Sequence, residues 1–235
     1  MQMHRKAWEY CYIVQALHEC GMLAPGRRGL GFAVGQEPLS AMFASLGCEI
    51  VASDLDMDKV DKAKWVETNQ HAASLEVLNQ RGICEADSFR RRVTFRFLDM
   101  RELPDGLGTF DFMWSSCSLE HLGTIAQGEK FILESLKYLK PGGVAVHTTE
   151  FNVRSNLLTL TRGPIVVFRR RDLERIAKRL GRLGYAVDLD FSSGNLPYDK
   201  VIDRPPYKEE IHLKLWLSFY VVTSFGLIIE RPRGD

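Results

Sequence analysis

The sequence predicts an α/β fold with a doubly wound, mostly parallel sheet of seven strands and helices on both faces. Short apolar runs rich in β-branched and aromatic residues alternate with longer amphipathic stretches, as in a parallel sheet whose strands are joined by helices. The first run leads through a glycine turn into a helical stretch and then into a second run that ends in an acid. Because the sequence shows no internal repeat and no linker-like segment, we expect one domain over residues 1–235.

Five helices are expected along the chain, each with a helical pattern of apolar residues. The first closes at Gly21, and the second begins at Pro38, a residue that suits the first turn of a helix. The last is the run DLERIAKRLGRL. The expected helices cover residues 8–19, 38–46, 60–79, 130–139 and 172–183.

The expected strands lie between these helices. They cover residues 30–34, 49–53, 93–98, 110–115, 144–148, 186–189 and 220–230, and the fifth follows the turn Pro141-Gly142-Gly143. The apolar run at 215–229 is too short for a membrane span, which needs about 20 residues. Its β-branched content favours a buried strand, and we expect no membrane span.

The composition of the chain limits the partners that it is expected to bind and the cellular compartment in which it is expected to work. The 31 basic and 30 acidic side chains give a net charge of +1, which argues against nucleic acid or an anionic membrane as the partner. The five cysteines form no C-x-x-C pair, and the first twenty residues lack the apolar core of a signal peptide. Reduced thiols in a cytoplasmic protein are the simplest interpretation.

Residues 30–56 are the most informative stretch of the chain. The strand at 30–34 runs into Gly35, and the second strand ends in Asp54, 19 residues after that glycine. A glycine turn lets the backbone approach a nucleotide-like ligand, and an acid at this place can accept hydrogen bonds from a ribose diol. The segment therefore predicts a cofactor of the nucleotide class.

Together with three later motifs, this segment resembles the class I S-adenosylmethionine-dependent methyltransferases over most of the chain. Asp99-Met100 ends the third strand, Phe110–Ser115 forms the fourth, and a Leu-x-Pro-Gly-Gly turn at 139–143 precedes the fifth. The first loop departs from the family's Gly-x-Gly-x-Gly, because only Gly35 is retained and Gly31 stands where the usual acid precedes the loop.

The resemblance implies the Rossmann-like fold of that family and S-adenosylmethionine as cofactor. We expect Glu37 to replace the missing acid and to bind the ammonium group of the methionine moiety; alternatively, Glu37 is a first-turn helix acid favoured by the helix dipole. The implied cofactor-binding residues are Ala33, Gly35, Glu37, Asp54, Leu55, Asp99, Met100 and Ser115.

The candidate residues for the chemistry follow the fourth and fifth strands, because open α/β sheets bind ligands beyond the carboxyl ends of their strands. His121 and His147 are the expected general bases, with Glu150 beside them. Each histidine has an alternative role, in a helix cap or on the helix-covered face of the sheet. Glu120-His121 is similar to a metal-binding run of small-RNA terminal 2′-O-methyltransferases, but Cys117 replaces the first glutamate there, so no metal is predicted. A divalent-metal site built from Glu120, His121 and His147 or Glu150 stays open as an alternative.

The predicted function is O-methylation of a small-molecule or saccharide hydroxyl. Residues 1–28 are expected to form a helical lid, and residues 152–212 to contain polar loops on the substrate side. Two alternatives stay open. One is a peptide or RNA methyltransferase with the same cofactor, and the other is a non-catalytic module that binds S-adenosylmethionine.

Overall fold

A nine-stranded sheet forms the centre of the computed structural model, which describes residues 3–56, 72, 74–192, 194–207 and 210–234. Its order is β4-β3-β2-β5-β6-β11-β10-β8, with β7 beside β11. The strands are β2 (Arg28–Phe32), β3 (Glu49–Asp54), β4 (Val93–Phe97), β5 (Phe110–Ser116), β6 (Leu139–Asn152), β7 (Ala186–Asp188), β8 (Ile202–Asp203), β10 (Lys214–Leu217) and β11 (Tyr220–Glu230). This arrangement confirms the doubly wound, mostly parallel fold.

Five neighbouring strands run parallel and end at one edge of the sheet. The pairs β4–β3, β3–β2, β2–β5 and β5–β6 are all parallel, whereas β11 is antiparallel to β6. Ser116, the last residue of β5, lies opposite Thr148, and β6 continues for four further residues to Asn152. Glu150 therefore lies beyond the end of β5, on the edge where ligands of such sheets bind.

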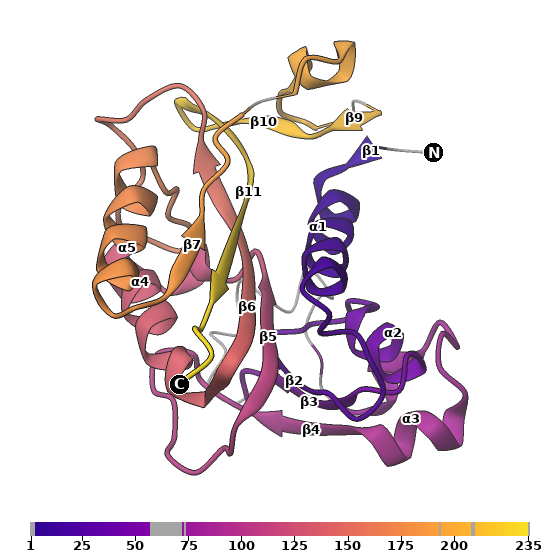
Figure 1. Ribbon diagram of the computed structural model, residues 1–235. Coiled ribbons are helices and arrows are strands. Elements are labelled where there is room, and N and C mark those ends of the chain that lie inside the picture. The colour runs from indigo at the N-terminus through magenta and orange to yellow at the C-terminus, as the bar shows by residue number, and fades with distance from the viewer. Residues whose placement is uncertain (1–2, 57–71, 73, 193, 208–209, 235) are drawn as a thin grey trace.

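Helices cover both faces of the sheet. Figure 1 shows α4 (Ile125–Ser135) and α5 (Arg170–Arg182) on one face, and α1 (Arg5–Glu19) and α2 (Leu39–Ser45) on the other. Two buried apolar clusters follow from this layering. Phe131 and Leu173 belong to the cluster under α4 and α5, and Ile13, Phe43 and Trp114 to the cluster under α1 and α2.

Two expected helices differ from the structure, and one helix was not expected. Most of the helix expected at 60–79 falls on residues 57–71 and 73, outside the described part of the chain, and its end is a 3₁₀ turn, η3 (Glu76–Asn79). The helix expected at 130–139 begins earlier, because the Thr124 side chain accepts a hydrogen bond from the backbone N–H of Gln127 and caps α4. The helix α3 (Ala86–Arg92) was not predicted; Glu85 caps it through two backbone N–H groups.

Residues 197–217 form an excursion that meets the start of the chain. It comprises η6 (Pro197–Lys200), β8, β9 (Ile211–His212) and β10. Strand β9 pairs in parallel with β1 (Met3–His4), above the carboxyl edge of the sheet at the top of Figure 1. Directly after β1, the first turn of α1 brings Arg5 to Glu150 near the end of β6. Within the described residues, no helix combines the length and the apolar character that a membrane span needs.

Candidate active site

The loop after β2 turns sharply away from the sheet. Ala33 and Gly35 have φ angles of +48° and +50°, and the backbone N–H of Val34 donates to the carbonyl of Ser53 on β3. A left-handed conformation costs alanine more than glycine. Ala33 nevertheless adopts the left-handed conformation that a glycine usually supplies at this place. The turn is therefore retained although the sequence of the loop differs.

The side chain of Trp114 occupies the space that the usual acid would need at position 31 of this loop. A Cβ atom on Gly31 would lie 2.4 Å from Cζ2 of Trp114, so the indole fills the space of any side chain at position 31. The indole N–H donates a hydrogen bond of 2.5 Å to Oε1 of Glu37. Trp114 thus fills the space beside position 31 and fixes the carboxyl group of Glu37 next to the first loop.

Glu37 is buried, with 5% of its surface exposed. Burial raises the pKa of its carboxyl group to about 8, and Asp54 contributes in the same direction, while the hydrogen bond from Trp114 and the charge of Lys6 act in the opposite direction. A buried acid of this kind is ionised when a cation binds beside it. The environment of Glu37 therefore suits the ammonium group of a methionine moiety.

Asp54 ends β3 and connects the first loop to the segment that follows. Its carboxylate accepts hydrogen bonds from the backbone N–H groups of Gly35 at 3.0 Å, Leu55 at 2.8 Å and Ala72 at 3.1 Å. The carboxylate thus lies directly against the glycine turn.

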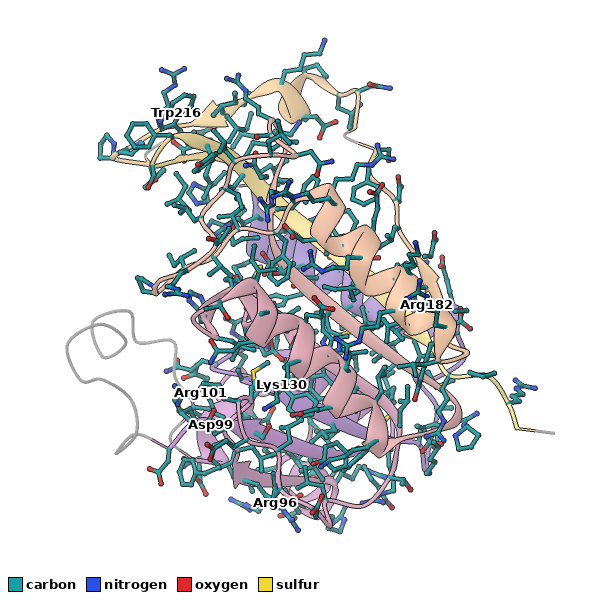
Figure 2. All side chains as sticks on the ribbon, turned by 90° about the vertical axis from the view of Figure 1, so that its left-hand side faces the viewer. Arg96, Asp99, Arg101, Lys130, Arg182 and Trp216 are labelled. Carbon is teal, nitrogen blue, oxygen red and sulfur yellow. The ribbon has the colours of Figure 1, made fainter. Side chains whose placement is uncertain are left out.

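Asp99 and Met100 follow β4 at the same edge. Asp99 forms an ion pair with Arg101, whose Nη2 lies 2.7 Å from Oδ2, and Figure 2 shows the two side chains together. Met100 is buried in the cluster under α4. Arg101 was not predicted as part of this site, although a cation two residues after the acid was visible in the sequence.

His121 lies on the 3₁₀ turn η4 (Leu119–His121), which follows β5. Its Nδ1 is 3.0 Å from the carbonyl oxygen of Pro164. Since a carbonyl can only accept, Nδ1 carries the proton and Nε2 carries the lone pair. Burial lowers the pKa of His121, so the ring is neutral at neutral pH. This tautomer is the one that a general base needs.

His147 lies on the opposite face of β6 from Glu150. Its Nδ1 is 2.8 Å from Oγ of Ser115, and its ring packs edge-on against Phe131 of α4. Burial lowers the pKa of His147 to about 4, and Nε2 is buried without a hydrogen-bond partner among the described residues. This position favours the alternative role, on the helix-covered face, for His147 and for Ser115 as well.

Glu150 joins a buried group of acids at the ends of β5 and β6. Ligand atoms of Cys117, Glu120 and Glu150 lie within 4.8 Å of one another. Burial raises the pKa of Glu120, and burial also raises that of Glu150 to about 7, against the effect of Arg5. A metal would have to share Glu150 with the Arg5 guanidinium, which forms an ion pair with its Oε1.

The first turns of α1 supply the charges that sequence reasoning missed. Glu9 is fully buried and accepts hydrogen bonds from Ser116 and Ser224, while Lys6 lies 3.0 Å from it. Burial alone would raise the pKa of Glu9, but the charge of Lys6 and the hydrogen bonds hold it below its ordinary value. The run Arg5-Lys6 with an acid one turn later was the available signal.

Comparison with known proteins identifies the family. Residues 30–147, half of the chain, match the family model described as a methyltransferase domain. The chain belongs to this family. It is a class I S-adenosylmethionine-dependent methyltransferase, as the motifs of the first loop and the later strands predicted. No curated protein matches the sequence at a significant level.

Solved structures share the fold of this methyltransferase. The magnesium protoporphyrin IX methyltransferase of Synechocystis PCC 6803, with bound S-adenosylhomocysteine, has a TM-score of 0.56 and 16% identity over 94% of this chain and 81% of that one. The cyclase SpnF reaches 0.60 at 15% identity, covering 95% and 81% of the two chains. An S-adenosylmethionine-dependent methyltransferase from Mesorhizobium loti reaches 0.54 at 15%, covering 92% and 96%. At such identities the likeness shows the fold alone.

A substitution at Gly31 tests the packing of the methyltransferase's first loop. Gly31→Ala forces the Trp114 indole to move, and we expect a loss of about 1–3 kcal/mol in the free energy of unfolding. Gly181→Ala is the matched control, because nothing lies within 4 Å of its Cβ position in α5, and it should stabilise by about 0.5–1 kcal/mol. Chemical denaturation measures both; equal stability of the two variants would contradict the packing.

Proposed function

We propose that this methyltransferase transfers a methyl group to a hydroxyl of a small molecule or saccharide, with His121 as general base. S-adenosylmethionine supplies an activated methyl group when bound. The tautomer of His121 carries the proposal, because Nε2 can take up the proton that a hydroxyl loses during transfer. Direct transfer of the methyl group needs no covalent intermediate on Cys117. The pKa of this thiol is raised well above its ordinary value, and burial is the largest cause.

The cofactor is proposed to lie along the first loop. In this arrangement, Asp54 accepts hydrogen bonds from the ribose hydroxyls. Asp99 and Met100 hold the adenine, and Glu37 binds the ammonium group of the methionine moiety. Ala33, Gly35 and Leu55 then supply backbone contacts, and Ser115 lies behind them in the sheet. The buried carboxyl of Glu37, with its pKa of about 8, supports this placement, because a bound cation would ionise it.

The acceptor is proposed to enter at the carboxyl edge of β5 and β6. Residues 1–28 would act as the lid, since α1 places its first turn against Glu150, and residues 152–212 contain the loops beside it. The five free cysteines suit a cytoplasmic protein. The buried acids at this edge, together with the balanced charge of the chain, favour a small acceptor over RNA.

Isothermal titration with S-adenosylmethionine tests the cofactor site. The wild type should bind in the micromolar range, and Asp54→Ala should weaken binding roughly 10- to 100-fold, because charge-assisted hydrogen bonds to the ribose are lost. Asp105→Ala, a change at an exposed acid, is the control and should bind as the wild type does.

Two results would contradict the assignment of the cofactor site. One is the absence of micromolar binding by the wild type, which would also leave the chain without the proposed reaction. The other is unchanged affinity in Asp54→Ala. The reaction itself is assayed as release of S-adenosylhomocysteine with a panel of alcohols, sugars and amino sugars.

A further inference from the structure

Three carboxyl groups converge at the acceptor side, and the described side chains that neutralise them come from the first turn of α1. Glu9, Glu120 and Glu150 are 0%, 1% and 4% exposed. Arg5 pairs with Glu150 and Lys6 with Glu9. Buried carboxylates need cations or hydrogen-bond donors, because desolvation of a lone charge is costly. Any acceptor that moves the first turn of α1 aside meets a strongly acidic surface.

The contact of Arg5 with Glu150 leaves both partners incompletely satisfied. Nη1 of Arg5 lies against Oε1 of Glu150, while Nε of Arg5 and Oε2 of Glu150 are buried without a hydrogen-bond partner among the described residues. A guanidinium bound to a carboxylate commonly uses two parallel hydrogen bonds. Oε2 of Glu150 is thus a hydrogen-bond acceptor without a donor among the described residues. The Arg5 guanidinium therefore satisfies only one of the two oxygens of this carboxylate.

Arg5 is held in place by few contacts. The residue before it, His4, belongs to the two-residue strand β1, which pairs with β9, and its ring stacks on His212 with 4.6 Å between the ring centres. The sheet holds α1 from Glu9 onward, because Glu9 is buried and accepts hydrogen bonds from Ser116 and Ser224. Ile13 and Leu17 are buried further along the helix. Residues 5–8 can therefore leave Glu150 while the remainder of α1 stays packed.

From this arrangement we propose that the acceptor carries a cationic group, an amine or a guanidine, that displaces Arg5 and binds Glu150. Arg5 is then an intramolecular stand-in for the acceptor, and the hydroxyl of the same molecule faces His121. An amino sugar or an amino alcohol has this chemistry. The inference rests on the proposed function and narrows its substrate class.

Hydrogen–deuterium exchange on the wild type, saturated with S-adenosylhomocysteine, tests the displacement. The probes are methylguanidinium and its neutral isostere methylurea. Methylguanidinium should speed exchange in residues 5–12 several-fold and leave α5 unchanged, whereas methylurea should change neither segment. Glu150→Gln should abolish the response. A permanent structural ion pair predicts no difference between the two probes, and that result would overturn the proposal.

Thermal melting of Arg5→Gln gives a second measurement, at about pH 8.5, which lies above the pKa of about 7 that Glu150 has while Arg5 is in place. Methylguanidinium should raise the melting temperature at a concentration at least tenfold lower than in the wild type, and Arg5→Gln/Glu150→Gln should not respond. Arg90→Gln, which breaks an exposed pair with Asp87, is the matched control and should melt as the wild type does with either probe.

The two proposals fail in different ways. Lack of binding of S-adenosylmethionine would overturn the proposed function. Intact cofactor binding, with equal responses to methylguanidinium and methylurea or with turnover of glucose but not of glucosamine, would overturn the cationic acceptor alone.

Discussion

Replacing His121 with alanine is expected to lower kcat by roughly 10²- to 10⁴-fold, the usual contribution of a general base. The carbonyl of Pro164 fixes the proton of His121 on Nδ1, so the lone pair is on Nε2. Nε2 can therefore take up the proton that the acceptor hydroxyl loses. The measurement is release of S-adenosylhomocysteine with an acceptor that the wild type turns over.

The pH profile separates a base from a residue that only positions the acceptor. Burial lowers the pKa of His121, so the ring stays unprotonated at neutral pH and activity should fall as pH drops through that lowered pKa. The exposed His18→Ala is the control and should leave kcat unchanged. A variant in which KM rises while kcat and the acid limb of the profile persist would contradict the role of base.

Replacing Glu37 with glutamine is expected to weaken S-adenosylmethionine binding by roughly 30-fold or more, since truncating one partner of a buried charge pair costs about 2–5 kcal/mol. Glutamine keeps the size and the hydrogen bond from Trp114 but cannot carry the charge. Titration calorimetry measures the affinity. Glu134→Gln, on the exposed side of α4, is the control and should bind normally.

The same residue couples cofactor binding to a proton. With a pKa of about 8 in the free protein, Glu37 is mostly protonated at pH 7, and a bound ammonium group favours its ionised form. Binding should release nearly one proton at pH 7, and affinity should rise about tenfold per pH unit below pH 8. Above about pH 8 the gain ends, because Glu37 is already ionised in the free protein, and affinity should fall as the amino group of the ligand loses its own proton.

Calorimetry in two buffers of different ionisation enthalpy counts the released proton. The observed enthalpy of the wild type should differ between phosphate and Tris, and that of Glu37→Gln should not. If the variant releases the same proton, Glu37 does not bind the ammonium group. The alternative of a first-turn helix acid is wrong in either case, because α2 begins at Leu39, after Glu37.

Local patterns sufficed to predict seven of the nine strands in the described sheet, because each of the seven has its own apolar run. The two-residue strand β8 was not predicted, and the apolar run at 215–229 forms two antiparallel strands, β10 and β11, instead of one. Cap signals were present but were not used, such as Thr124 three residues before Gln127 at the start of α4. The alternation along β6 also separates His147 from Glu150, because positions three apart in a strand face opposite sides.

The charge states of the site residues depend on contacts between side chains far apart in the sequence, which no local sequence pattern predicts. Trp114 holds Glu37 across 77 residues, and Arg5 reaches Glu150 across 145. Side-chain pairs at such separations are set by how helices pack on the sheet, and a single sequence does not specify that packing. Sequence reasoning therefore identified Glu37 and Glu150 but not the residues that set their charge.

The hydrogen bond from Ser224 to Glu9 joins residues 215 positions apart. During synthesis the chain emerges from its amino end, so α1 is available long before β11. Glu9 has its full set of partners only after the last strand has inserted beside β6. The buried charge of Glu9 is therefore fully satisfied only in a chain that has been made as far as Ser224.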